Sequence, residues 1–247
     1  LDFLSDHRKA SEIFENAFVE YKATAQKIPR LADFYLDYAS YMKAWSEIER
    51  AKIAHKNEEY LTAMKHYENA TNLLKASKLW GYLSSNFLAW SILEQAEDLS
   101  RKERTNESME AFKKAADLFS EAQEVFEKET GNIKALDEKE KATELSRASL
   151  RRKDYCLARE NIEQARMHDR RGDYEKSAEN YDLAATTFEN IMEASESETE
   201  RKEIQPIVHM CRAWQKMKMA DGRNLPELYH EASELFMKAK EHSTRDK

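Results

Sequence analysis

The sequence predicts an all-α protein built from antiparallel helices, and three observations lead to this fold class. The 247 residues include only 4 Gly and 3 Pro, whereas β architectures need both residues for their many turns. Valine, a typical strand residue, occurs at positions 19, 125 and 208 alone. A hydrophobic period close to 3.6 residues also runs through nearly the whole chain. We therefore expect most of the chain to be helical.

Short interruptions divide the chain into about eight to ten helices. They fall at residues 27–29, 78–82, 104–106, 130–132, 171–173, 194–199 and 221–226. Each interruption holds a Gly, a Pro or a polar residue that caps helices. Residues 132–171 contain no Gly and no Pro over 40 residues. This segment is therefore either one long helix or two helices that break near Lys153 and Asp154.

The charge and cysteine content limit the classes of partner and the compartment. The net charge is −7, which argues against nucleic-acid binding, since that needs a strongly basic face. No apolar run reaches the roughly 18 residues that a membrane span needs. Cys156 and Cys211 are too few for a disulfide scaffold, so we expect reduced thiols and a cytoplasmic location. The chain begins with Leu1 rather than Met, and we expect it to be a piece of a longer protein.

An internal repeat is the most informative pattern in the sequence. An aromatic residue, a small residue, a second aromatic residue and an alanine recur at offsets of three, seven and ten. The small residues at 63, 115, 177 and 232 follow a weaker copy at 10, so the spacings are 53, 52, 62 and 55. Small residues let a neighbouring helix approach closely, and the aromatic ring fills the space beside the contact. The copies are His7, Ala10, Phe14, Ala17; Tyr60, Ala63, Tyr67, Ala70; Phe112, Ala115, Phe119, Ala122; Tyr174, Ser177, Tyr181, Ala184; and Tyr229, Ala232, Phe236, Ala239.

Residues 172–184 resemble the second helix of a tetratricopeptide repeat nearly position by position. Ala165 lies nine residues before Tyr174, where that family keeps a small residue in its first helix, and Ala51 has the same relation to Tyr60. The family unit is about 34 residues, shorter than this one, and its Trp and Leu-Gly signature is absent. The resemblance implies a right-handed α-solenoid of long helical hairpins, similar to adaptors of the soluble NSF attachment protein type. No stretch rich in Pro, Gly or Ser divides the chain, so we expect a single domain over residues 1–247 with about four and a half repeats. The resemblance implies a protein-binding role, and because no convergent catalytic set appears, we expect neither catalysis nor a cofactor.

A basic stripe is the candidate binding surface for a partner. Residues 147–171 hold eight basic and four acidic side chains in a chain of net charge −7. Arg152, Arg159 and Arg166 recur every seven residues and Arg170 follows, so all four share one slowly drifting helix face. Arginine forks well onto carboxylates. We expect these four residues to face the groove and to bind an acidic segment or a C-terminal carboxylate, while ion pairs with neighbouring glutamates are the alternative. If they do not bind, exposed aromatic residues such as Tyr35 and Trp214 are the next candidates.

Sites for catalysis or metal binding have weaker support. A single Glu-x-x-His pair, Glu227 and His230, falls short of the two that a di-iron bundle needs, so we expect no metal. Helical ribonucleases of the HEPN type use an Arg and a His with four to six residues between them. Arg50 and His55 resemble this pattern with four intervening residues, and Arg223 and His230 with six. A helical nuclease that uses Arg50 and His55 is therefore the alternative function.

Overall fold

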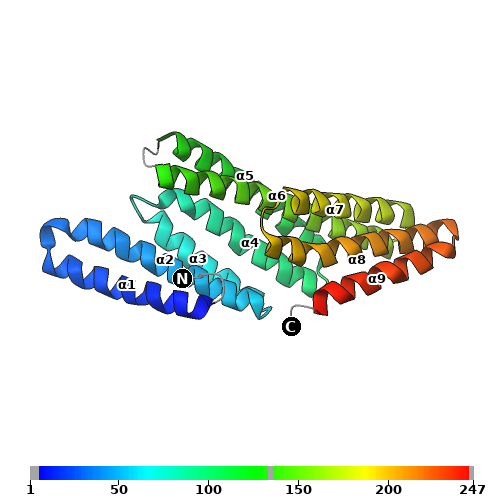
Figure 1. Ribbon diagram of the computed structural model, residues 1–247, viewed down its shortest axis with the longest axis horizontal. Coiled ribbons are helices and arrows are strands. Elements are labelled where there is room, and N and C mark those ends of the chain that lie inside the picture. The colour runs from blue at the N-terminus through cyan, green and yellow to red at the C-terminus, as the bar shows by residue number, and fades with distance from the viewer. Residues whose placement is uncertain (1–5, 133–135, 245–247) are drawn as a thin grey trace. The chain divides into compact units, whose positions relative to one another are not determined.

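The computed structural model describes residues 6–132 and 136–244. About 90% of the described residues are helical, and none of them lies in a strand. The prediction of an all-α protein is therefore confirmed for the part of the chain that the structure describes. Figure 1 traces the helices in chain order.

Consecutive helices pack against one another, as expected for a chain of helical hairpins. Contacts join α1 to α2, α2 to α3, α7 to α8 and α8 to α9. Two short 3-10 turns, η1 (Pro29–Leu31) and η2 (Gly81–Leu83), precede α2 and α4. The helices are α1 (His7–Lys27), α2 (Ala32–Lys56), α3 (Tyr60–Lys75), α4 (Ser84–Arg101), α5 (Thr105–Asn132), α6 (Leu136–Arg170), α7 (Tyr174–Ala194), α8 (Glu198–Arg223) and α9 (Glu227–Thr244).

Most predicted interruptions coincide with helix ends, and the differences have local causes. The turn between α2 and α3 was not predicted, because it contains neither Gly nor Pro; Glu58 makes it by adopting a φ of 59°. At the other extreme, α5 continues through Gly131 to Asn132, since one glycine costs a helix only about 1 kcal/mol. Residues 132–171 were expected to form either one long helix or two. Residues 136–170 form the single helix α6, without a break near Lys153 and Asp154. Residues 133–135 lie outside the described residues.

The chain divides into two compact units. The first comprises Leu1–Asp98 and Asp117–Leu150, and the second comprises Leu99–Ala116 and Arg151–Lys247. The division falls within α4, α5 and α6, so each of these helices supplies residues to both units.

Each unit has its own apolar core. In the first unit Tyr67 stacks on Trp90 at a centroid distance of 5.7 Å, and Phe87 and Phe126 are buried nearby. In the second unit the core joins α6, α7 and α8. It contains Ile162, Tyr181, Phe188, Ile204, Val208 and Cys211. The small residues of the predicted repeat, Ala63, Ala115, Ser177 and Ala232, are all buried.

A second repeated pattern lies in α2, α4, α6 and α8, the helices that precede the predicted repeat and are called first helices below. It is an octapeptide bounded by two alanines, and all eight of these alanines are at most 1% exposed. Alanines seven residues apart lie on one helix face, so a neighbouring helix can approach that face closely along two turns. The octapeptides are residues 44–51 (AWSEIERA), 89–96 (AWSILEQA), 158–165 (ARENIEQA) and 213–220 (AWQKMKMA).

We predict that Ala165→Leu destabilises the protein by about 1–3 kcal/mol, because the side chain is fully buried and the extra carbon atoms overpack the core. The free energy of urea unfolding, followed by circular dichroism, measures this loss. Ala194→Leu adds the same atoms at an exposed position at the end of α7 and should change stability by less than about 0.5 kcal/mol. Equal losses for the two variants would contradict the close helix packing at Ala165.

Candidate functional site

The four arginines of the predicted basic stripe lie on the part of α6 that belongs to the second unit, and the structure gives each of them a partner within that unit. Arg152 Nη2 lies 3.6 Å from Glu200 Oε1, and its guanidinium carbon lies 5.9 Å from the centroid of the Tyr155 ring. Arg170 Nη2 lies 3.6 Å from Glu103 Oε2. The Arg170 pair is largely exposed, so it contributes little, about 0–1 kcal/mol.

Arg159 and Arg166 have a different role, because they converge on polar groups in the protein interior. Arg166 Nη1 donates to Glu163 Oε1 at 2.7 Å and to Ser100 Oγ at 3.1 Å. Arg159 Nη2 donates to the same Ser100 hydroxyl at 3.3 Å, and its guanidinium carbon lies 5.1 Å from the centroid of Phe112. These contacts tie α6 to α4 and α5.

Glu163 is the buried centre of this cluster. Its side chain is fully buried, and Oε1 accepts hydrogen bonds from Ser100 at 2.6 Å and from Arg166. Oε2 is also buried and accepts no hydrogen bond from the described residues. A buried carboxylate is costly unless it is paired. Removing Arg166 would therefore leave an uncompensated buried charge.

The same position of the octapeptide is charged and buried in every first helix. It is the sixth residue, and its exposed fraction is 5% for Glu49, 0% for Glu94 and Glu163, and 6% for Lys218. Glutamate and lysine are almost never this deeply buried unless they are paired. The repetition therefore calls for a partner at each of these positions.

The partner comes from a fixed position on the preceding first helix, four residues beyond the end of its octapeptide. We call the resulting contacts the cross-helix pairs. In the first unit, His55 Nδ1 lies 2.9 Å from Glu94 Oε1. In the second unit, Ser100 Oγ donates to Glu163, and Asp169 Oδ1 lies 2.7 Å from Lys218 Nζ.

In the last cross-helix pair the charges are exchanged. The preceding first helix supplies the acid, Asp169, and the following one supplies the base, Lys218. Lys218 Nζ also lies 3.2 Å from Asp221 Oδ2 and 5.6 Å from the ring centroid of Tyr174. Burial acts to lower the pKa of Lys218, but Asp169 and Asp221 outweigh it and hold that pKa above its usual value.

Glu49, the sixth residue of the earliest octapeptide, has a partner on α1. His7 Nδ1 lies 2.6 Å from Glu49 Oε2. Lys52, one turn further along α2, donates to Glu49 Oε1 at 2.6 Å. The sequence analysis missed this whole set of buried charges, although the recurring octapeptide was the pattern that could have found it.

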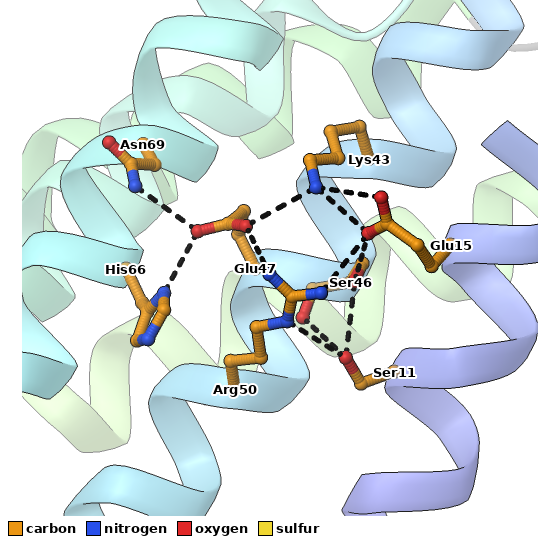
Figure 2. Close-up of polar contacts among 8 residues, drawn as sticks. All are labelled: Ser11, Glu15, Lys43, Ser46, Glu47, Arg50, His66 and Asn69. Atoms are coloured by element: carbon orange, nitrogen blue, oxygen red, sulfur yellow. Dashed lines mark hydrogen bonds and ion pairs between the residues drawn. The ribbon is translucent and has the colours of Figure 1, made fainter. Parts of the chain in front are cut away.

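A polar network joins α1, α2 and α3 within the first unit, and Glu47 of α2 is its centre (Figure 2). Glu47 Oε2 accepts hydrogen bonds from Asn69 Nδ2 at 3.1 Å and lies 2.8 Å from His66 Nδ1, both on α3. Arg50 Nη1 donates to Glu47 Oε1 at 3.2 Å. Burial acts to raise the pKa of Glu47, but the bonds from His66 and Asn69 outweigh it, so the pKa is lowered.

The same network continues to α1 through Glu15 and Ser11 (Figure 2). Lys43 Nζ donates to both oxygens of Glu15, at 2.8 and 2.9 Å, and Ser46 Oγ donates to Oε2 at 3.0 Å. Ser11 Oγ lies 3.1 Å from Ser46 Oγ. Two acids therefore face two bases, so the network is close to neutral and acts as a polar connection between the three helices.

An open groove of about 400 Å³ lies beside this network, between α2 and α3. Five of the seven residues that line it are polar. They are Ser40, Lys43, Glu47, Asn69 and Asn72. Because Lys43 and Glu47 are already bonded within the network, the groove presents no concentrated charge to a ligand.

Arg50 and His55, the two residues of the alternative nuclease function, contact different helices. Arg50 reaches Glu15 and Ser11 of α1, whereas His55 meets Glu94 of α4. Arg223 and His230 are also apart in their contacts: Arg223 Nε lies 3.7 Å from Glu175 Oε1, and His230 Nε2 lies 3.4 Å from Glu234 Oε1.

The described residues offer no cluster of metal ligands and no exposed thiol. No group of three or more His, Cys, Asp or Glu side chains there could hold a metal ion. Cys156 and Cys211 are both buried. Burial raises the pKa of Cys211 to about 12, so its thiol is protonated at neutral pH.

Comparisons with known proteins give no relative. No protein-family model, no curated protein and no solved structure matches the chain. Among the helices that the structure describes, none combines the length and the apolar character that crossing a bilayer requires.

We predict a pH dependence that originates at Glu94. Burial raises the pKa of Glu94 above its ordinary value of 4.5, although His55 acts to lower it and Glu97 to raise it further. The folded protein therefore binds this proton more tightly than the unfolded chain. The resulting stabilisation is complete below pH 4.5 and is lost as the pH rises through the raised pKa.

Urea unfolding at a series of pH values tests this prediction. Relative to Glu94→Gln, the wild type should lose free energy of unfolding as the pH rises from 4.5 toward neutrality. Glu110→Gln changes an exposed glutamate of α5 and should leave the pH profile as it is in the wild type. A constant difference between wild type and Glu94→Gln over this range would contradict the prediction.

Proposed function

We propose that this chain is a non-catalytic adaptor of the tetratricopeptide type, a right-handed α-solenoid that binds a protein or peptide partner. The observation that supports it most is the double repetition, in which an alanine-bounded octapeptide in each first helix precedes an aromatic and small-residue pattern in the next helix. Such units bury their apolar faces only against stacked neighbours, and the surfaces they build are typically used for binding. The two buried thiols fit a reducing compartment such as the cytoplasm.

The proposed binding surface is the basic stripe of α6, with an acidic segment of the partner as its ligand. Arg152 and Arg170 are the residues best able to exchange their present carboxylates, since both pairs are 3.6 Å long. Arg159 and Arg166 lie between them along α6 and bond to Ser100 and Glu163 in the interior. A partner carboxylate would therefore compete with Glu200 and Glu103 rather than with Glu163.

We predict that Arg152→Glu/Arg170→Glu weakens binding of labelled hexaglutamate about tenfold or more, because two attractive contacts become repulsive; tenfold corresponds to about 1.4 kcal/mol. Fluorescence anisotropy measures the affinity. Binding by the wild type should also weaken as salt rises, since salt screens exposed charges. Arg159 and Arg166 are left unchanged, because both bond to groups in the interior, and a glutamate in place of Arg166 would face the buried Glu163 carboxylate.

Arg104→Glu/Arg223→Glu is the matched control. It makes the same change of charge in the second unit at two exposed arginines outside α6. If both double variants lose equal affinity, or if neither loses any, the stripe is not the binding surface. Metal-independent cleavage of single-stranded RNA that disappears in His55→Ala would favour the nuclease alternative and contradict the adaptor role.

A further inference from the structure

The first unit exposes large apolar side chains at the end where α2 begins and α3 ends. The exposed fraction is 43% for Leu31, 49% for Phe34 and 51% for Leu79. Leu31 and Phe34 lie where the chain turns into α2, and Leu79 lies in the connection from α3 to η2. Exposed apolar side chains that gather on one surface commonly mark an interaction site. We call these three residues the apolar end.

Hydrogen bonds hold the connection that carries Leu79 against the first turns of α2. The backbone amides of Lys78 and Leu79 donate to Oδ1 and Oδ2 of Asp37, at 3.1 and 3.2 Å. Ser77 Oγ accepts a hydrogen bond from the amide of Trp80 at 2.9 Å. The backbone on both sides of Leu79 is therefore anchored, while half of its side chain remains in solvent.

Phe34 begins a row of aromatic residues on α2 that later parts of the chain cover. Its ring centroid lies 4.7 Å from that of Tyr38, and the Tyr38 centroid lies 4.6 Å from that of Trp80. Tyr41, one turn further along α2, stacks on Trp80 at 4.1 Å. The exposure of Phe34 therefore arises where the cover from the α3–α4 connection ends, and not on an outer face of α1.

The apolar end lies among basic side chains. Residues 27–37 and 75–80 contain four bases and two acids, so their net charge is +2 in a chain of −7. The bases are Lys27, Arg30, Lys75 and Lys78, and the acids are Asp33 and Asp37. Lys78 pairs with Asp33 at 3.3 Å. The other three bases are exposed, and within the part of the chain that the structure describes they form no ion pair.

This combination of side chains suits the surface of an anionic membrane. Apolar side chains enter the boundary between headgroups and acyl chains, and nearby bases are attracted to anionic headgroups. Mobile headgroups can approach bases on two separate connections, whereas a folded partner would need a carboxylate placed for each. Two of the three apolar side chains are leucines, which do not stack on bases as aromatic rings do. Tyr35, Tyr38 and Trp80, half-buried behind them, are of types enriched at membrane interfaces.

We propose that the apolar end of the first unit binds the surface of membranes that contain anionic lipids. Leu31, Phe34 and Leu79 enter the headgroup boundary, and the three exposed bases face the headgroups. Binding of this kind lies at the surface and needs no helix that crosses the bilayer. The proposal goes beyond the proposed adaptor function and uses residues of the other unit, so the two can fail independently.

Sedimentation of the full chain with lipid vesicles tests this proposal. The wild type should bind vesicles of equal parts phosphatidylcholine and phosphatidylserine, and should bind phosphatidylcholine vesicles at least about fivefold more weakly. Leu79→Glu should weaken binding to the mixed vesicles about tenfold or more, because it places a charge in the apolar contact. Lys27→Glu/Arg30→Glu should weaken it by a similar factor, because two attractive charges become repulsive. Circular dichroism checks that each variant folds.

Leu61→Glu is the matched control, because Leu61 is an apolar residue of the same unit, 43% exposed, near the opposite end of α3. It should bind the mixed vesicles as the wild type does, and Leu79→Glu should still bind hexaglutamate normally. The proposal is overturned if the wild type does not bind the mixed vesicles, or if Leu79→Glu binds them as well as the wild type or Leu61→Glu as poorly as Leu79→Glu.

Two other occupants of the apolar end would also contradict the proposal. Labelled single-stranded RNA that displaces the vesicles, and whose binding Leu79→Glu abolishes, would identify a nucleic-acid surface. Self-association in sedimentation without lipid that Leu79→Glu abolishes would identify a second copy of the chain.

Discussion

The constraint on which the structure depends is the buried charge at the sixth position of each first-helix octapeptide. Alanines at both ends of the octapeptide let neighbouring helices approach closely, and this approach removes water from the residue between them. Glu94, Glu163 and Lys218 therefore need partners from protein rather than from solvent. The cross-helix pairs supply those partners from a fixed position on the preceding first helix. A shift of one helix past the next would break the pair, so the pairs favour one register. This is the attested use of buried polar groups, whose net contribution to stability is small.

The pairs differ chemically from one unit to the other, although their geometry is the same. In the first unit the cross-helix pair joins Glu94 to His55, and His7 and His66, which lie outside these pairs, meet the buried glutamates of α2. The second unit uses a hydroxyl and an arginine at Glu163, and an exchanged acid and base at Lys218. Each solution neutralises or hydrogen-bonds the charge, which is what burial demands. The same demand explains why part of the basic stripe of α6 is committed to the interior, with Arg166 bonded to Glu163.

Much of the fold could be predicted from the sequence, because it depends on local patterns. Helical periodicity and scarce glycine gave the fold class, and the small residues at 63, 115, 177 and 232 were correctly placed in the interior. The turn at Glu58 could not be predicted, because it depends on a positive φ at a residue type that rarely adopts one. The repeat copy that begins at Phe112 does not mark a helix start, because α5 begins at Thr105, seven residues earlier. A pattern with a seven-residue period can be aligned on a helix in two ways, so it does not fix where the helix begins. Ser100, the partner that Arg159 and Arg166 share, lies about 60 residues away in sequence, and no periodicity indicates contacts between such distant positions.

The measurement that tests this account most directly is a double-mutant cycle at the last cross-helix pair. The free energies of urea unfolding of Asp169→Ala, Lys218→Met and the double variant are compared with that of the wild type. The account predicts that the double variant loses less stability than the two single variants together, with a coupling energy of about 1–3 kcal/mol. The same cycle on Lys176 and Asp173, an exposed pair 2.9 Å apart, should give less than about 1 kcal/mol. A coupling near zero between Asp169 and Lys218 would contradict the claim that buried charges on the first helices are held by the preceding helix.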